Sequence, residues 1–103
     1  QAAVNNGSIL DRGCLINTGS TVDHDCRLGE CVHVSPGAHL GGNVTAGECT
    51  WFGIGSCVRN GVEVSRDVVV GAGAVVVSDI PEGITVVGVP ARKFDSSVRD
   101  GIR

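Results

Sequence analysis

Two histidines, His24 and His33, lie nine residues apart in a segment rich in hydrogen-bonding side chains. Acidic residues flank the first of them, Asp23 on one side and Asp25 on the other. A neutral imidazole, with an ordinary pKa of about 6.5, can take a proton from an attacking hydroxyl or amine at neutral pH. A carboxylate beside it can orient the ring and stabilise the imidazolium. We therefore expect any chemistry at residues 17–33, although His24 on a solvated corner with Asp25 as a turn former is the plainer interpretation.

The composition indicates one small β-rich domain that must hold this segment in place. The chain has 103 residues, of which 16 are glycine, 42% are hydrophobic and only 3% are aromatic. Most of the apolar residues are small or β-branched, and such residues favour strands over helices. Because a domain of this length buries a limited fraction of its surface, we expect it to form an oligomer.

Charge and targeting signals argue against several classes of function. A net charge of −3 and a pI near 5.4 give no electrostatic footprint for nucleic acid. Six of the eight basic residues lie in the C-terminal 45 positions, which leaves room for a local anion site. We find no long apolar run, signal peptide or lipidation motif and expect no membrane association. The five cysteines are an odd number, so we interpret them as reduced thiols of a cytoplasmic protein.

The strongest pattern in the chain is a six-residue repeat. An apolar residue recurs at every sixth position thirteen times: Val4, Leu10, Ile16, Val22, Leu28, Val34, Leu40, Ala46, Phe52, Val58, Val64, Val70 and Val76. A small or β-branched residue precedes each by two positions, and side chains two apart in a strand share a face, so both columns are expected to point inward. A Gly, Asn or Asp that tolerates positive φ follows most of them after three positions. Cys31 and Cys49 are the exceptions.

A short strand and a corner in every six residues predict a parallel β-helix, a three-sided prism with eighteen residues per coil. Stacked at about 4.8 Å, the thirteen units make a little over four coils. A β-sandwich would need strands spaced by about 8 to 12 residues. The count breaks after Val76, and an apolar strand is expected at 85–89. The β-helix domain is placed at 1–94, followed by a polar C-terminal tail at 95–103 that is frayed or a short helix.

Several motifs on this repeat form a second, more specific pattern. They are Asn17-Thr18, Val22-Asp23-His24-Asp25-Cys26, Gly29-Glu30, His33-Val34-Ser35, Gly53-Ile54, Ser56-Cys57-Val58 and Gly88-Val89-Pro90-Ala91. Together they resemble the sialic acid O-acetyltransferase family of hexapeptide-repeat acetyltransferases, which also contains N-acetyltransferases of nucleotide-linked sugars. The resemblance covers about residues 7 to 94. It implies a left-handed prism, which the six-residue period alone does not determine, and a homotrimer.

The resemblance also implies a reaction, the direct transfer of acetyl from acetyl-CoA to a hydroxyl or amino group of a sugar or nucleotide-linked sugar. His24 matches the general base and Asp25 the acidic residue that raises its basicity. Asn17 matches a polar residue near the acceptor. His33 matches a family histidine that contacts the acetyl end of the coenzyme; the alternative is that His33 is only an outward-facing strand residue. Nine residues are half a coil, so both histidines can share a site only across the groove between two neighbouring subunits.

For the coenzyme, Ile54 and Ala72 match family positions that contact acetyl-CoA, and we add the neighbouring Gly53 and Gly71, together with Arg92 and Lys93, as candidate contacts. The first four lie in two pairs eighteen residues apart, so they are expected to stack on one edge of the prism. There the glycines would let backbone amides approach the pantetheine arm. The two basic residues follow the Gly-Val-Pro-Ala motif and are where we expect contacts to the nucleotide phosphates. Each of these residues is otherwise an ordinary corner or a solvated charge.

One departure from the family pattern leaves the acceptor open. The family usually carries an N-terminal βαβ domain that helps to bind the sugar nucleotide, and this sequence shows none. The chain also opens within a repeat, which suggests a truncated product or an oligomer that covers the first coil. The identity of the acceptor and the choice between O- and N-acetylation therefore stay undecided.

A zinc protein of the γ-carbonic anhydrase type is a rival interpretation, because His24, Cys26, Cys31 and His33 lie within ten residues. However, Cys26 belongs to an inward column and Cys31 to a corner. The four side chains therefore do not converge within one chain as a tetrahedral zinc site requires. We assign no metal.

The remaining alternatives concern the other cysteines and the repeat itself. Cys57 lacks an obvious base that would make it a nucleophile. Cys31 and Cys49 stack at one corner in consecutive coils, either as a redox pair or as two small residues in equivalent positions. A purely structural β-helix would explain the hexads equally well but would leave the Asp-His-Asp cluster without a role.

Overall fold

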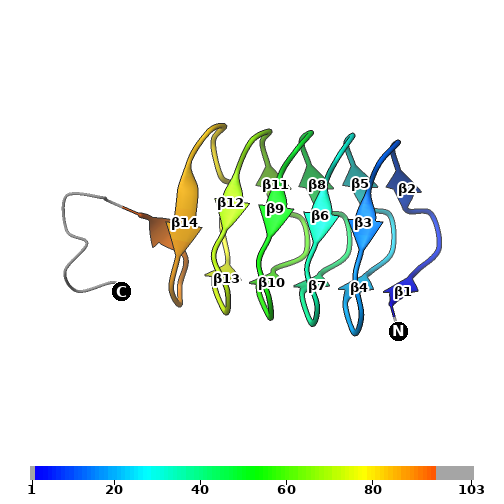
Figure 1. The fold of residues 1–103 in the computed structure, drawn as a ribbon, viewed down its shortest axis with the longest axis horizontal. Coiled ribbons are helices and arrows are strands. Elements are labelled where there is room, and N and C mark those ends of the chain that lie inside the picture. Colours follow the sequence, from blue (N-terminus) through cyan, green and yellow to red (C-terminus); the bar gives the residue numbers. More distant parts are fainter. Residues whose placement is uncertain (1, 95–103) are drawn as a thin grey trace.

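The computed structural model describes residues 2–94, so the tail expected at 95–103 lies outside the described residues. Each of the thirteen hexads forms a two-residue strand, and successive strands wind into a three-sided prism (Figure 1). No helix occurs within residues 2–94. The strands are β1 (Ala3–Val4), β2 (Ile9–Leu10), β3 (Leu15–Ile16), β4 (Thr21–Val22), β5 (Arg27–Leu28), β6 (His33–Val34), β7 (His39–Leu40), β8 (Thr45–Ala46), β9 (Trp51–Phe52), β10 (Cys57–Val58), β11 (Glu63–Val64), β12 (Val69–Val70), β13 (Val75–Val76), β14 (Thr85–Val87) and β15 (Arg92–Lys93). The predicted all-β fold class is confirmed.

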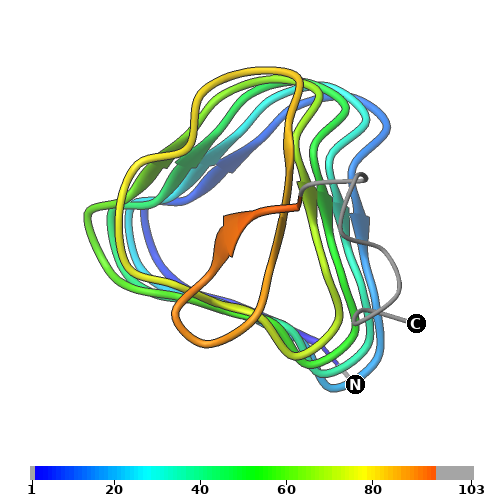
Figure 2. The same cartoon turned by 90° about the vertical axis from the view of Figure 1, so that its left-hand side faces the viewer.

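Each face of the prism is one sheet, and within β1 to β13 the strands that are three apart along the chain pair in parallel. We name the three sheets sheet A (β1-β4-β7-β10-β13), sheet B (β2-β5-β8-β11) and sheet C (β3-β6-β9-β12-β14-β15). The Cα partners of β1 to β13 are eighteen residues apart, as in His33↔Trp51 and Cys57↔Val75. Seen from the C-terminal end, the chain runs clockwise as it comes toward the viewer, so the coils are left-handed (Figure 2). This agrees with the handedness that the resemblance implied.

Every corner between these strands contains a residue with positive φ. Most are Gly, Asn or Asp, as predicted, but Cys31 (φ 61°) and Cys49 (φ 59°) take the same conformation. The corner is held by hydrogen bonds between coils, since the Cys31 amide donates to the Arg12 carbonyl at 3.1 Å and the Cys49 amide to the Glu30 carbonyl at 2.8 Å. Non-glycine residues rarely adopt a left-handed φ by themselves. Cysteine can do so at these corners because the hydrogen bonds between neighbouring coils hold the backbone in that conformation.

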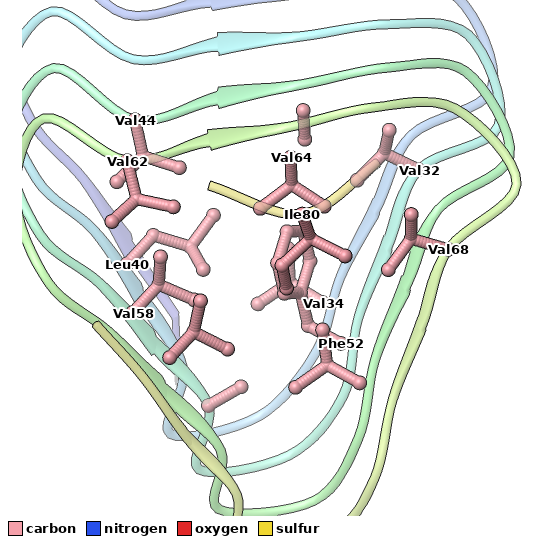
Figure 3. Packing of buried hydrophobic residues seen from close by; sticks show 14 of the residues in the cluster. Val32, Val34, Leu40, Val44, Phe52, Val58, Val62, Val64, Val68 and Ile80 are labelled. Carbon is pink, nitrogen blue, oxygen red and sulfur yellow. The ribbon is translucent and has the colours of Figure 1, made fainter. Parts of the chain in front are cut away.

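The two inward columns form one continuous core along the axis of the prism (Figure 3). Phe52, Leu40 and the inward valines are fully buried, and the small column of Cys26, Val32, Ala38 and Val44 is buried beside them. Val4 and Leu10 belong to the same column, but they stay partly exposed because nothing among residues 2–94 packs over the first coil. The inward direction of both columns is thus confirmed from Val22 onward.

The six-residue count breaks after Val76, as the sequence indicated, but the chain still completes one more coil. Ile80 bridges to Val64 on sheet B, and β14 pairs with β12 through Val70↔Val86, so this last coil has sixteen residues between partners. Two residues are missing from one corner, and the inward alternation then resumes. The strand expected at 85–89 ends at Val87, because Gly88 (φ 94°) turns the chain. The chain then enters β15, which pairs antiparallel to β14.

Candidate active site

A groove of about 440 Å³ lies on the outer surface of sheet C. Six of the residues predicted from the sequence line it: Asn17, His33, Gly53, Ile54, Gly71 and Ala72. They come together because the eighteen-residue register places equivalent positions of successive coils in vertical columns. The groove is therefore a direct product of the repeat, and its chemistry depends on which residues occupy those columns.

His33 and Trp51 form an aromatic stack on one wall of the groove. They are register partners on β6 and β9, their ring centroids are 4.0 Å apart, and their planes are inclined by 28°. Trp51 keeps 48% of its surface exposed, although it is a large apolar residue. The stack orients the His33 imidazole toward the groove and gives it an aromatic neighbour that can also interact with a bound ligand.

Backbone forms the floor of the groove, because glycine occupies two positions where a side chain would not fit. A Cβ on Gly53 would lie 2.6 Å from the Val70 carbonyl oxygen, and one on Gly71 would lie 2.9 Å from the Val87 Cγ1. Beside them Ile54, which is 62% exposed, forms an apolar edge. A bare backbone floor with an apolar edge fits a thin, flexible chain that carries amides, such as the pantetheine arm of a coenzyme.

His24 lies elsewhere, at the corner between β4 and β5 on the edge shared by sheets A and B. Its Nδ1 is 3.2 Å from an Asp25 carboxylate oxygen, and both side chains are more than half exposed. Asp25 reaches the ring because it holds the left-handed corner conformation, with φ 57°. The His24 Nε2 has no hydrogen-bond partner among residues 2–94, which leaves it available to a substrate proton.

Two glycines that the sequence prediction did not single out make room for this pair. A Cβ on Gly42 would lie 2.5 Å from the His24 Nε2, and a Cβ on Gly7 would collide with the Asp25 carboxylate. Both glycines stand at the corners of adjacent coils, one on each side of the pair. The signal that could have found them is their spacing of about one coil from the catalytic candidates.

The two aspartates beside His24 have different surroundings. Asp23 accepts hydrogen bonds from the Asn5 side-chain amide at 3.0 Å and from the His24 backbone amide at 2.8 Å. These two bonds, the one from Asn5 being the larger effect, hold the pKa of Asp23 below its usual value. Asp23 thus fixes the backbone of the corner, whereas Asp25 contacts the imidazole itself.

The structure does not bring all predicted residues into one place. Neither His24 nor Asp25 lines the groove on sheet C. Arg92 and Lys93 form β15 at the end of sheet C, two strands beyond the part of the groove that Val69 lines. The groove and β15 therefore share one sheet, while the imidazole–carboxylate pair occupies another edge of the prism.

The described residues contain no arrangement suited to a metal ion. No group of three or more His, Cys, Asp or Glu side chains in residues 2–94 is placed to hold one. Cys26 is buried, and its thiol contacts the Gly41 carbonyl oxygen at 3.1 Å. Its burial raises the pKa of this thiol above its ordinary value, which keeps it protonated at neutral pH.

Comparison with known proteins places this architecture among acetyltransferases. The chain is 37% identical over 87 residues to GDP-perosamine N-acetyltransferase of Escherichia coli O157:H7, a match that covers 79% of the chain and 39% of that protein. The acetyltransferase domain of PglB from Neisseria gonorrhoeae FA1090, solved in complex with acetyl coenzyme A, is 52% identical with a TM-score of 0.90 and is matched over 90% of this chain and 45% of its own.

A third similar protein was solved with two molecules bound. PerB from Caulobacter crescentus, solved in complex with CoA and GDP-perosamine, is 44% identical with a TM-score of 0.90, over 91% of this chain and 45% of its own. No profile of a known protein family matches the chain. The chain spans less than half the length of these three relatives. No helix among the described residues is long and apolar enough to span a membrane.

The class is therefore that of the hexapeptide β-helix proteins. Within that class, the chain is a homologue of the hexapeptide-repeat acetyltransferases, as the motifs around His24, His33 and Gly53-Ile54 indicated.

Proposed function

We propose that this β-helix transfers acetyl from acetyl-CoA to an amino or hydroxyl group of a sugar or nucleotide-linked sugar. The observation that carries the proposal is the groove on sheet C, in which a glycine floor meets the His33–Trp51 stack. Relatives solved in complex with acetyl coenzyme A, or with CoA and GDP-perosamine, support this choice of donor and acceptor class. Gly53 and Gly71 have no side chains to cover the groove floor, and a Cβ at either position would collide with the next coil, so the backbone there stays open to a coenzyme.

In this proposal His24 is the general base. Acetyl-CoA, when bound, supplies the acetyl group as a thioester. The His24 Nε2 accepts the proton of the acceptor N–H or O–H while that atom bonds to the acetyl carbon, and the imidazolium then returns a proton to the sulfur that leaves. Asp25, at 3.2 Å from Nδ1, holds the ring in the tautomer with a free Nε2 and stabilises the imidazolium. Asn17 is assigned to the acceptor and His33 to the acetyl end of the coenzyme.

The complete site requires more than one copy of the chain. His24 lies on the edge between sheets A and B and His33 on sheet C, so one prism does not bring the two imidazoles together. A homotrimer with threefold symmetry would repeat the same interface three times and place His24 of one subunit opposite the groove of the next. Arg92 and Lys93, at the end of sheet C, would then meet the phosphates of the coenzyme's nucleotide.

The site proposal is tested by measuring acetyl transfer to a nucleotide-linked amino sugar, and to free amino sugars and serine, with the purified protein. His24→Asn preserves the shape of the side chain but removes the base, so we expect kcat/KM to fall by about 10²- to 10⁴-fold. Binding of acetyl-CoA, followed as thermal stabilisation, should be nearly unchanged in His24→Asn. In His33→Ala that stabilisation should weaken.

Two outcomes would contradict the proposal in different ways. A protein that acetyl-CoA does not stabilise at about a hundred times the expected Kd, where a binding site would add about 2.7 kcal/mol, is a structural β-helix. A protein that binds acetyl-CoA but whose His24→Asn variant transfers acetyl at the normal rate uses another base. The cytoplasmic location inferred from free thiols stays a prediction.

A further inference from the structure

We propose that Cys31 and Cys49 form a reversible thiol–disulfide pair that links two consecutive coils at the corner just before the His33–Trp51 stack. The two cysteines occupy the same corner, between sheets B and C, in successive coils. This inference does not rest on the proposed acetyl transfer, because it concerns covalent chemistry of the chain itself.

The geometry of the corner brings the two thiols together. Both residues have the same left-handed conformation, with φ 61° and 59°, so their side chains leave the backbone in the same direction. Stacked coils are about 4.8 Å apart, which lies within the Cα separation of about 4.4 to 6.8 Å that disulfides span. Both thiols are exposed to solvent, so a reagent can reach them.

The pKa of Cys49 agrees with a Cys31 thiol close by. Its pKa is raised above the ordinary value, first by desolvation and next by hydrogen bonding with Cys31 and by the charge on that residue. Asp67 and Glu48 add smaller effects in the same direction. The pKa of Cys14 is raised by burial and, to a smaller extent, by the charge on Cys31, so Cys14 also lies near this corner. Its thiol, however, packs against the core and donates to the Gly29 carbonyl at 3.1 Å, whereas Cys31 and Cys49 are both exposed.

Each of the two cysteines lies only two residues before a ring that lines the groove. His33 follows Cys31 by two residues and Trp51 follows Cys49 by two, and the residues between them, Val32 and Thr50, are fully buried. Each corner is thus anchored to the strand that carries one ring of the stack. A bond between the corners would fix the spacing of β6 and β9 at the point where their outward rings touch.

The reaction needs a thiol oxidant, for which a low-molecular-weight disulfide is sufficient. The thiolate of one cysteine attacks that disulfide, forms a mixed disulfide and releases one small thiol. The thiolate of the second cysteine then attacks the protein sulfur and releases the other. In total two protein thiols lose two electrons and two protons, one S–S bond forms, and one small disulfide becomes two small thiols.

The test uses oxidised glutathione with the folded chain of 103 residues. We expect the five free thiols to fall to three without retained glutathione, and peptide mapping to find the bond between Cys31 and Cys49. The emission of Trp51, the single tryptophan, should change on oxidation and return with dithiothreitol. Cys57→Ser is the matched control and should behave as the native chain does.

Single substitutions in the pair distinguish closure from simple thiol modification. Cys31→Ser and Cys49→Ser should each keep one glutathione as a mixed disulfide and show no closure. The proposal is overturned if the native chain, with an unchanged circular dichroism spectrum, retains glutathione on both cysteines or forms its bond elsewhere. It is equally overturned if the bond forms but the emission of Trp51 stays constant.

Discussion

At the scale of single residues, the position of the candidate base His24 depends on two glycines, whose missing side chains leave space for the imidazole and for Asp25. The His24 ring lies against Gly42, where a Cβ would come within 2.5 Å of Nε2, and the Asp25 carboxylate occupies the space that a side chain at Gly7 would need. An exposed imidazole can usually adopt several rotamers. Contact with the neighbouring coils restricts the rotamers of His24 although its side chain stays exposed to solvent. The pair therefore keeps contact with solvent while one ring nitrogen points at a carboxylate.

Gly42→Ala should displace the imidazole and reduce acetyl transfer. The φ of Gly42 is not in the left-handed region, so alanine fits the backbone and the added methyl acts only on the ring. We expect kcat/KM to fall by about tenfold or more, a part of the contribution of a general base, with little change in the melting temperature. Asn60→Ala, in the same column one coil further on, is the control. An unchanged rate in Gly42→Ala would show that the orientation of His24 is not what matters.

Asn5→Ala should make the stability of the protein less dependent on pH at its acid end. The pKa of Asp23 is lowered in the folded state, mainly by the Asn5 amide. A lowered pKa contributes stability above the unfolded value, and this contribution is lost as the pH falls through the folded value. The native chain and the variant should therefore differ most near neutral pH and converge in acid. Melting temperatures across the acid range would check this, and a difference that grows in acid would contradict it.

At the scale of strands and corners, the sequence predicted most of the fold because one period governs it. Thirteen apolar hexads became thirteen strands in register. The same reasoning failed where tertiary contacts replaced local preference. Cys31 and Cys49 were exceptions by residue type, yet inter-coil hydrogen bonds hold both in the corner conformation. The break in the count after Val76 and the strand beyond it were predicted, but the position of Ile80 in the last coil was not, because that coil has sixteen residues between partners. The strand β15 was missed because its two residues have no repeat.

Phe52→Ala should destabilise the prism far more than Trp51→Ala. The two residues are neighbours on β9, but Phe52 is fully buried in the axial core and Trp51 lies on the outer face. Removing a buried phenylalanine leaves a cavity and costs about 3 to 5 kcal/mol. Denaturant unfolding of both variants at one protein concentration would measure the difference. Equal losses would mean that the inward and outward faces of β9 contribute alike.

At the scale of the whole molecule, the prism separates the parts of its own candidate site. Its groove is on sheet C and its imidazole–carboxylate pair is on the edge between sheets A and B. The sequence predicted this separation from half a coil between the two histidines. It could not predict the partner surface, because residues that face solvent in one prism carry no periodic signal for what covers them. Assembly is therefore the step that would complete the site.

Mixing two inactive variants offers a decisive test of that assembly. His24→Asn lacks the base and His33→Ala lacks the coenzyme contact, so each alone should be nearly inactive. In a trimer whose sites take one histidine from each of two subunits, random co-assembly at equal amounts restores both histidines in about a quarter of the sites. We expect co-refolded mixtures to recover activity toward that fraction. A mixture of the native chain with the double variant His24→Asn/His33→Ala controls for the exchange of subunits between trimers. No recovery in a mixture shown to contain mixed trimers would mean that both histidines act from one chain.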